Sequence, residues 1–409
     1  MTLSPSAYAP DPHVAFAWLW IGGKPITVDD ITGRPRHLES FSFDLNVETL
    51  GTFEFVLFDP EFDVVEEILM NSGGKCQFKF GYTTGLTSPT YDGLIIEYIP
   101  SFSFDGIRIH IKGFTMAVDG HKSVETRVWR DKKIHEVVET IAKDRGWKSD
   151  VDATIPVEFR EDLEKSDLKD NTWKQSQSDL SFITDRLQKQ AVRAKDKAGG
   201  YVLYFDPEKK TLHFHPPRYE EAPVKTFVWR DKLNEFLRFT PQYSGGFLGS
   251  MILGGSARLN TISMENTEMV PTVKSDKKRP DGDKAPPADP KQTKGEAPDN
   301  DDKQRSTAVI KKAYPDEYFG LNEAKFWWYR AAWLAAFRGE LEVVGDPTLK
   351  PWKKYEIQVA KKNGGLHWTS GKYWANGINH TIQNGEYHTT LKLWRDHAKG
   401  GTDPSVTYG

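Results

Sequence analysis

Two passages far apart in the chain show the same succession of β-strand and turn signals. The first begins at Lys75 and reads KCQFKFGYTTGLTSPTYDGLIIEYIPSFSFDGIRIHIKGF; the second begins at Lys354 and reads KYEIQVAKKNGGLHWTSGKYWANGINHTIQNGEYHTTLKLW. Each contains an alternating strand, a loop with Gly, a strand that opens near a Tyr, a turn, and an alternating closing strand. The turn Asn384-Gly385 in the second passage is a strong hairpin signal. We predict an internal duplication, which implies two similar antiparallel β-barrels; the alternative is a chance likeness between two β-meanders.

A chain of 409 residues can form two or three domains, each with its own core. The order of strand and helix signals predicts an α+β fold that is mainly β. The predicted units are a first tube-like β-barrel in 1–120, a helical α/β insertion in 121–200, a second tube-like barrel in 201–255 and 311–400, an inserted loop or linker in 256–310, and a tail in 401–409.

Helical periodicity appears in only a few segments. Apolar residues recur at helical spacing in 131–147, and Ser178 is a suitable N-cap for a second helix that runs to about residue 195. We also predict a short helix at 61–70 and a strongly apolar helix at 321–339. The last of these contains Trp327, Tyr329 and Trp333, which do not share one helical face, so burial in a core or interface is favoured over a sugar-stacking platform.

The segment 256–310 differs from the rest of the chain in composition. It is rich in Pro, Asp and Lys and has few apolar residues, as in DKKRPDGDKAPPADPKQTKGEAPDNDDKQRS. Such a sequence buries too little surface to offset the entropy cost of ordering. We interpret it as a loop or linker, with a partner-binding arm that orders on assembly as the alternative.

Charge and cysteine content exclude several classes of protein. The formal net charge is −3 at pH 7, so no overall charge attracts the chain to nucleic acid or to a membrane. The only cysteine, Cys76, cannot form an intrachain disulfide or a site built from several cysteines. The start, MTLSPSAYAPDP, lacks the basic and apolar regions of a signal peptide, and the apolar run AFAWLWI is too short to span a bilayer.

No specific pattern of catalytic or metal-ligating residues is present. His213 and His215 share a face of a predicted strand, but no third ligand is evident nearby, and His380 is expected to be packed or hydrogen-bonded. A glycoside hydrolase needs two carboxylates across a cleft, whereas the carboxylates here fall where solvated faces are expected: Glu136, Glu139, Asp179, Asp185, Glu340 and Glu342. We therefore predict no catalytic residues, no metal and no cofactor.

Four passages resemble one known family in their order along the chain. DKKIHEVVETIAKDRGW and NTWKQSQSDLSFITDRLQKQA are similar to two helical segments of the baseplate hub proteins of contractile phage tails, often called late control protein D. GELEVVGDPTLKPWKKYEIQV is similar to that family's Gly-x-Pro strand pair, and SGKYWANGINHTIQNGEYHTTLKL to its closing hairpin. The N-terminal hub part of type VI secretion spike proteins is related to the same family. The resemblance covers about residues 125–396 and rests on the order of the passages.

The resemblance implies structural roles for the residues that match the family's motifs. These positions are Trp173, Asp179, Phe182, Leu187, Gly345, Pro347, Gly371, Tyr373, His380, Gly385, Tyr387 and Thr389. It further implies a homotrimer whose six barrels form a ring with pseudo-six-fold symmetry.

The function implied is that of a structural baseplate hub, not an enzyme, in a phage tail or tail-like particle. Such a hub adapts a hexameric tail tube to a trimeric spike and lines the channel for DNA and the tape-measure protein. The implied partners are the tube protein, the spike protein, the C-terminus of the tape-measure protein and the wedge proteins of the baseplate, with DNA present only transiently and no membrane. The expected location is the tail tip of the virion, after assembly in the host cytoplasm.

The chain departs from the family in two respects. The segment 256–310 is longer and more charged than the family's linker, and no oligonucleotide-binding barrel or β-helical needle follows the predicted second barrel. The spike is therefore expected to be another polypeptide. The alternatives are a tail-associated cell-wall hydrolase, which would turn over peptidoglycan, and a carbohydrate-binding adhesin, which would bind glycan through exposed Trp side chains.

Overall fold

The computed structural model describes most of the chain, with several gaps. The described residues are 14–28, 38–59 except 48, 74–155 except 119, 121–123 and 131, 172–218 except 196–199 and 217, 221–243 except 231–232, 248–258, 262–268, 306–311, 326, and 337–395 except 363. The predicted helix at 61–70 and the predicted tail at 401–409 lie outside these residues.

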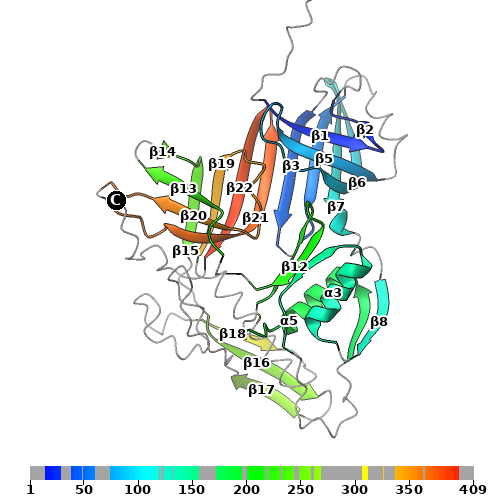
Figure 1. Ribbon diagram of the computed structural model, residues 1–409, viewed down its shortest axis with the longest axis vertical. Coiled ribbons are helices and arrows are strands. Elements are labelled where there is room, and N and C mark those ends of the chain that lie inside the picture. Colours follow the sequence, from blue (N-terminus) through cyan, green and yellow to red (C-terminus); the bar gives the residue numbers. More distant parts are fainter. Residues whose placement is uncertain are drawn as a thin grey trace, which may run out of the picture.

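The largest element is one 14-stranded sheet composed of two sets of strands, which lie next to each other in the upper part of Figure 1. The N-terminal set comprises β1 (Ala15–Ile21), β2 (Lys24–Pro25), β3 (Leu38–Asn46), β4 (Thr52–Phe58), β5 (Lys75–Tyr82), β6 (Tyr91–Ser103) and β7 (Gly106–Thr115). The C-terminal set comprises β13 (Lys225–Arg230), β14 (Leu233–Asn234), β15 (Arg238–Tyr243), β19 (Phe337–Val344), β20 (Lys354–Val359), β21 (Gly371–Gln383) and β22 (Glu386–Arg395).

The two sets have the same strand order. Along the sheet, the N-terminal strands follow the order β2-β1-β5-β6-β7-β4-β3, and the C-terminal strands follow β14-β13-β20-β21-β22-β19-β15. When each strand is ranked by its place in the chain, the two orders are identical. One orientation differs, because β1 is antiparallel to β5 whereas β13 is parallel to β20.

The closing hairpins of the two sets agree in detail. β6 and β21 each have 13 residues, and β7 and β22 each have 10. Both hairpins are closed by a two-residue turn, at 104–105 and at Asn384-Gly385. Both first strands also have an irregularity at the same place, between Ile95 and Glu97 in β6 and between Ala375 and Gly377 in β21. These coincidences support the internal duplication predicted from the two passages.

Alternating side chains give both sets one common core. In β4, for example, Phe53, Phe55 and Leu57 are buried and the intervening residues are not. A single apolar cluster contains buried side chains from both sets, such as Phe78 of β5 and Tyr373 of β21. The two sets therefore form one folded body, with apolar residues on one face of the sheet and polar residues on the other.

The two sets are joined edge to edge by β21 and β3. β21 pairs with β22 on one edge; on its other edge it pairs with β20 through Gly371–Trp374 and with β3 through Gly377–Gln383. Because β3 uses this edge to contact β21, it has no ladder with β1 within the described residues. The predicted mainly-β fold is present, but the described strands do not close into separate barrels as predicted.

An α/β unit, here called the insert unit, lies between the two sets in the chain and below them in Figure 1. Its elements are β8 (Val124–Arg130), α3 (Ile134–Asp144), β9 (Lys148–Val151), β10 (Thr172–Ser178), α4 (Asp179–Phe182), a π-helical turn (Ile183–Leu187), α5 (Gln188–Gln190), β11 (Val202–Asp206) and β12 (Thr211–His215). β12 pairs parallel with β9, so β11 and β12 belong to this unit. The predicted boundary at residue 200 is therefore too early by this hairpin.

The helices of the insert unit begin near the predicted residues. In α3 the side chains predicted at helical spacing, from Ile134 to Ile141, are fully buried, and Glu136 accepts a hydrogen bond from the Lys133 backbone N–H at 2.8 Å. The second helical segment starts after Ser178, as predicted, but ends at Gln190 instead of about residue 195. None of the helices in the described part of the chain has the length and apolar character of a membrane span.

Two predictions are corrected by strands within or beside the segment 256–310. A three-stranded sheet consists of β16 (Leu248–Arg258), β17 (Ile262–Glu268) and β18 (Ser306–Lys311), so the charged, Pro-rich part is limited to the residues between β17 and β18. The predicted helix 321–339 lies outside the described residues apart from Phe326, which is buried, and residues 337–339. Those last residues start β19, because they pair with β15 and β22.

Replacing Phe78 with Ala is expected to destabilise the common core strongly. Phe78 is fully buried, and its ring centroid lies 4.6 Å from that of Phe53 and 5.1 Å from that of Phe43. Loss of a buried Phe costs about 3–5 kcal/mol of unfolding free energy, measured by urea denaturation. The control is Phe104→Ala, since Phe104 is fully exposed in a single chain. Equal stability losses for the two variants at low protein concentration would contradict the assigned core.

Candidate functional site

The residues singled out by family resemblance fall into two places. Trp173, Asp179, Phe182 and Leu187 are all buried in the insert unit. The remaining positions belong to the C-terminal set, and several of these meet where β21 and β22 contact the N-terminal set.

The meeting point, here called the junction cluster, consists of His380, Tyr387, Thr389 and Gly345. The Tyr387 hydroxyl lies 2.8 Å from Nδ1 of His380, and the Thr389 hydroxyl lies 3.2 Å from the same nitrogen. The backbone N–H of Asp346 donates to the Thr389 hydroxyl at 3.0 Å. These bonds connect β21 and β22 to the chain that follows β19.

Gly345 is required by the close approach of the Tyr387 ring. A Cβ atom at residue 345 would overlap the ring atoms of Tyr387, so only glycine fits without moving the backbone. The Gly345 carbonyl oxygen accepts a hydrogen bond at 3.0 Å from the hydroxyl of Tyr82, which belongs to β5. The glycine thus lets the C-terminal set approach the N-terminal set.

Aromatic residues of the N-terminal set surround His380. Its ring centroid lies 4.7 Å from that of Phe80 and 6.4 Å from that of Phe43. Burial in this apolar surrounding lowers the pKa of His380 to about 3, while Asp346 has a smaller opposing effect. His380 is therefore neutral at physiological pH, as expected for a packed, hydrogen-bonded histidine.

The other matched positions in the C-terminal set shape its backbone. Gly385 has φ of 80° and Asn384 of 52°, the left-handed values that a tight hairpin turn needs. The Tyr373 hydroxyl donates to the Thr369 carbonyl at 2.5 Å, and the Arg395 guanidinium lies 5.0 Å from the Tyr373 ring centroid. Gly371 begins β21 with φ of 149°, and Pro347 is buried in the loop after β19.

Asp179 holds the helical part of the insert unit in place. Its fully buried carboxylate is 2.6 Å from a guanidinium nitrogen of Arg145 and accepts a hydrogen bond at 2.6 Å from the side-chain amide of Gln175. Phe182 and Leu187 pack into the same apolar core as α3. These contacts fit a structural role.

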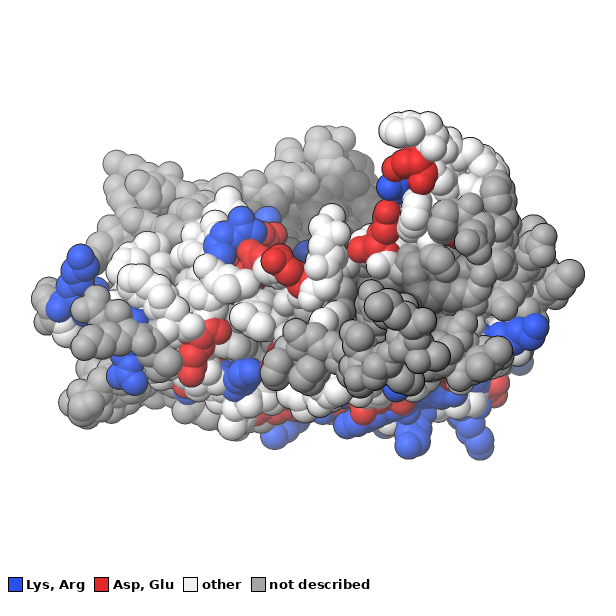
Figure 2. Space-filling view, turned by 90° about the horizontal axis from the view of Figure 1, so that it is seen from above, with Lys and Arg blue, Asp and Glu red and all other residues white. Residues whose placement is uncertain are grey.

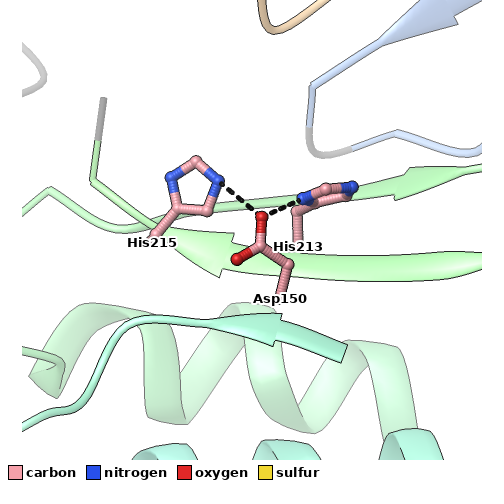
Figure 3. A group of neighbouring side chains, drawn as sticks. All are labelled: Asp150, His213 and His215. Atoms are coloured by element: carbon pink, nitrogen blue, oxygen red, sulfur yellow. Dashed lines mark hydrogen bonds and ion pairs between the residues drawn. The ribbon is translucent and has the colours of Figure 1, made fainter. Parts of the chain in front are cut away.

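A cluster of titratable residues was missed by sequence reasoning. Asp150 of β9 lies between His213 and His215 of β12, as Figure 3 shows. One carboxylate oxygen is 2.9 Å from Nδ1 of His213 and 4.0 Å from Nε2 of His215. The parallel pairing of β9 with β12 brings these residues together across a long stretch of chain, and no local spacing in the sequence could indicate it.

Protein groups already occupy most of the donor atoms of this cluster; Nε2 of His213 is the exception, with no hydrogen-bond partner among the described residues. Arg218 binds both oxygens of Asp150, at 2.6 and 2.9 Å. The hydrogen bond with His213, and then the bonds and charge of Arg218, hold the pKa of the Asp150 carboxyl well below its usual range. Nδ1 of His215 donates to the Pro216 carbonyl at 2.8 Å, and its Nε2 lies 3.1 Å from the Tyr204 hydroxyl. Burial lowers the pKa of His215 to about 4. A divalent cation would face the Arg218 charge, so this arrangement does not fit a metal site.

The β11–β12 hairpin, which carries His213 and His215, contacts both strand sets. The Tyr204 ring stacks on that of Trp352, from the C-terminal set, with centroids 4.2 Å apart. On the other side, Lys210 forms a 2.8 Å ion pair with Asp92 of β6. The insert unit is thus fixed to both sets.

The remaining carboxylates do not assemble into a catalytic pair. Glu139, Asp185 and Glu340 are exposed on three different elements, as expected for solvated faces. Glu342 accepts from Nδ1 of His388 at 3.1 Å and pairs with Arg238 at 3.2 Å.

The polar face of the large sheet, here called the charged face, carries opposite charges in pairs. Its ion pairs extend across both sets and the junction between them: Arg108–Glu39 at 3.0 Å, Lys112–Glu54 at 3.7 Å, Lys392–Asp44 at 3.4 Å and Arg238–Glu342 at 3.2 Å. Elsewhere on the surface the signs also mix: Figure 2 shows basic and acidic side chains next to each other on the described part of the face seen there.

Acidification is expected to destabilise the chain through His380. The unfolded chain binds a proton on this residue below about pH 6.5, whereas the folded chain does not until about pH 3. The free energy of unfolding therefore falls as the pH drops from 6.5 towards 3, by up to ~1.4 kcal/mol per pH unit from this residue.

Comparison with a His380→Asn variant isolates this effect. The Asn side-chain oxygen can accept the Tyr387 hydrogen bond but does not titrate, and His215 is present in both chains. Urea denaturation at pH 7.0, 6.0 and 5.0 should show a smaller decline for the variant. Parallel declines for the two proteins would show that His380 is not buried as a neutral group.

Comparisons with known proteins agree with this fold. No protein-family model matches the sequence, and no curated protein matches it significantly. Among solved structures, the tail protein from Neisseria meningitidis MC58 is similar over 95% of this chain and 98% of its own, at 13% identity and a TM-score of 0.58. The 43 kDa tail protein of prophage MuSo2 from Shewanella oneidensis is similar over 94% and 99%, at 14% identity and a TM-score of 0.56. Over nearly its whole length, the chain therefore has the fold of these two tail proteins.

Proposed function

We propose that this chain is the baseplate hub of a phage tail or tail-like particle. In this proposal three copies form a ring of six similar strand sets, which adapts a six-fold tail tube to a three-fold spike. The observation that carries the proposal is the identical strand order of the two sets within one chain. A protein with two equivalent sets can match six-fold and three-fold neighbours, because three copies present six similar units.

The shared fold supports a structural role in a tail. The two solved structures compared above are tail proteins by name, and each aligns over nearly its full length. The matched positions lie in cores, turns and hydrogen-bonded contacts, which fits building a rigid ring better than catalysis. The spike, tube, tape-measure and wedge proteins are the proposed partners, and the tail tip of the virion is the proposed location.

The charged face is the proposed lining of the channel. It runs across both sets and over the junction, for example from the Lys112–Glu54 pair to the Lys392–Asp44 pair. A channel that passes DNA must be hydrated yet must not hold phosphate groups, and rows of unpaired Lys or Arg would bind DNA strongly. Pairing each of these basic groups with a carboxylate meets both needs.

Mass measurement tests the proposal directly. Light scattering of the purified protein, alone and co-expressed with its spike protein, should give about three times the chain mass of 46.6 kDa in at least one case. Electron microscopy of that species should show six similar densities around a central opening. A monomer under both conditions, or turnover of peptidoglycan by the purified chain, would overturn the proposal.

A further inference from the structure

Among the described residues, one edge of β6 has no partner strand at the place where the equivalent edge of β21 is paired. β6 pairs with β7 along its length, but β5 covers its other edge only from Tyr91 to Leu94. Within the described residues, no ladder covers that edge from Glu97 to Ser103. The equivalent part of β21, Gly377–Gln383, pairs there with β3.

The open part of β6 exposes large apolar side chains. Phe102 is 69% exposed and Ile99 is 47% exposed, and Phe104 in the adjoining turn is fully exposed. The residue of β21 equivalent to Phe102 is Ile382, which is only 2% exposed because it lies in the β21–β3 contact beside Phe41. Phe102 is thus far more exposed than its equivalent in β21.

The counterpart of β3 is also open. β15 occupies the position in the C-terminal set that β3 occupies in the N-terminal set, and it pairs with β19 on one edge. On its other edge the described part of the chain contains no partner strand. In the described part of one molecule, β21 pairs with β3, whereas the equivalent edges of β6 and β15 do not pair with each other.

We propose that Glu97–Ser103 of β6 in one copy pairs antiparallel with β15 of a second copy, and so repeats the β21–β3 contact between molecules. The register follows from the contact within the chain, where His380 faces Phe43 and Ile382 faces Phe41. By equivalence, Phe102 faces Phe239 and Ser101 faces Thr240 of the neighbouring copy. Because each copy uses two different edges, the contact is repeated head to tail until the ring closes. This inference rests on the proposed ring and names the strands that close it.

Two prolines support this register. Ser103 and Gly106 flank the two-residue turn and form a hydrogen-bonded pair. Because hydrogen-bonded and non-hydrogen-bonded pairs alternate along the ladder, Pro100 and Ile109 form a non-hydrogen-bonded pair, and the nitrogen of Pro100 points away from β7 towards the other edge of β6. Pro241 of β15 is the equivalent of Phe43 and faces Pro100 in the proposed register. The two missing N–H groups then fall at one position of the ladder, whereas any slipped register would lose hydrogen bonds at two. Prolines at both edges also disfavour pairing with unrelated strands.

The side chains at the end of the contact are also complementary. In the chain, the N–H of Asn384 lies 3.5 Å from the carbonyl oxygen of Glu39, at the turn of the second hairpin. The equivalents at the open edges are Phe104 and Leu237, which is 53% exposed. A polar neighbour pair within the chain is thus replaced by an apolar pair where two copies would meet, and burial of both side chains would favour association.

Disulfide cross-linking tests the strand pairing and its register. Ser101 and Thr240 occupy a non-hydrogen-bonded pair, the geometry that brings Cβ atoms closest. Mild oxidation of the Ser101→Cys/Thr240→Cys chain should give covalently linked species of two and three chains. A mixture of the two single-cysteine variants should give linked pairs only, and either variant alone should give none; Cys76 is buried and is left unchanged.

The matched control is Ile99→Cys with Arg238→Cys, two positions that the proposed register places far apart. It should not cross-link under the same conditions. Cross-linking of the control but not of the Ser101/Thr240 chain would overturn the register. A species with the mass of three chains that lacks the Ser101–Thr240 cross-link would overturn the strand pairing and leave the hub function standing. A monomer under every condition would overturn both.

A second variant tests the apolar contact without altering the fold. Phe102→Glu should weaken association at least tenfold in sedimentation or light-scattering titrations, while its thermal unfolding as a monomer stays unchanged. Val128→Glu serves as the control, since Val128 is 54% exposed on β8, in a different sheet. Equal association of both variants with the unmodified chain would overturn the proposed contact.

Discussion

The pairing of β21 with β3 determines how the rest of the molecule is arranged. These strands lie far apart in the sequence, and their ladder turns two sets of seven strands into one sheet with one core. The ladder also uses the edge of β3 that a closed N-terminal barrel would need. Forming this contact requires the chain to bring distant segments together before much apolar surface is buried, so the contact also sets a large part of the entropy cost of folding.

The junction cluster explains how two sets of strands can approach so closely. A buried imidazole would be unfavourable in an apolar core, yet His380 remains because Tyr387 and Thr389 satisfy its Nδ1. Gly345 leaves room for the Tyr387 ring, and Tyr82 from the other set bonds to the carbonyl of that glycine. The bonds from Tyr387 and Thr389 hold the two strands of one hairpin together, and the bond from Tyr82 to Gly345 connects segments that lie far apart in the sequence.

The sequence predicted the local features of this fold better than its long-range contacts. The Asn384-Gly385 hairpin, the start of the helix after Ser178 and the repetition of the two passages all depend on short-range signals, and all appear in the structure. The sequence predicted that β11 and β12 belong to the second barrel, whereas they belong to the insert unit because β12 pairs with β9, and no local pattern indicates that pairing. The proximity of Asp150 to His213 and His215 was not predicted either, because it also depends on the pairing of β9 with β12. The burial of Asp179 and His380 likewise follows from distant partners such as Arg145 and Phe80.

One difference between the two sets has a consequence for symmetry. β13 runs parallel to β20, whereas β1 runs antiparallel to β5, so the chain enters the first strand of each set from opposite ends of the sheet. The insert unit and the β16–β18 sheet are attached to only some of the corresponding loops. In an assembly of three copies, neighbouring sets would share a backbone pattern at their sheets but present alternating surfaces at their rims. A partner with three-fold symmetry could then bind in one orientation, but not after rotation by one strand set about the ring axis, because the loops it meets would differ.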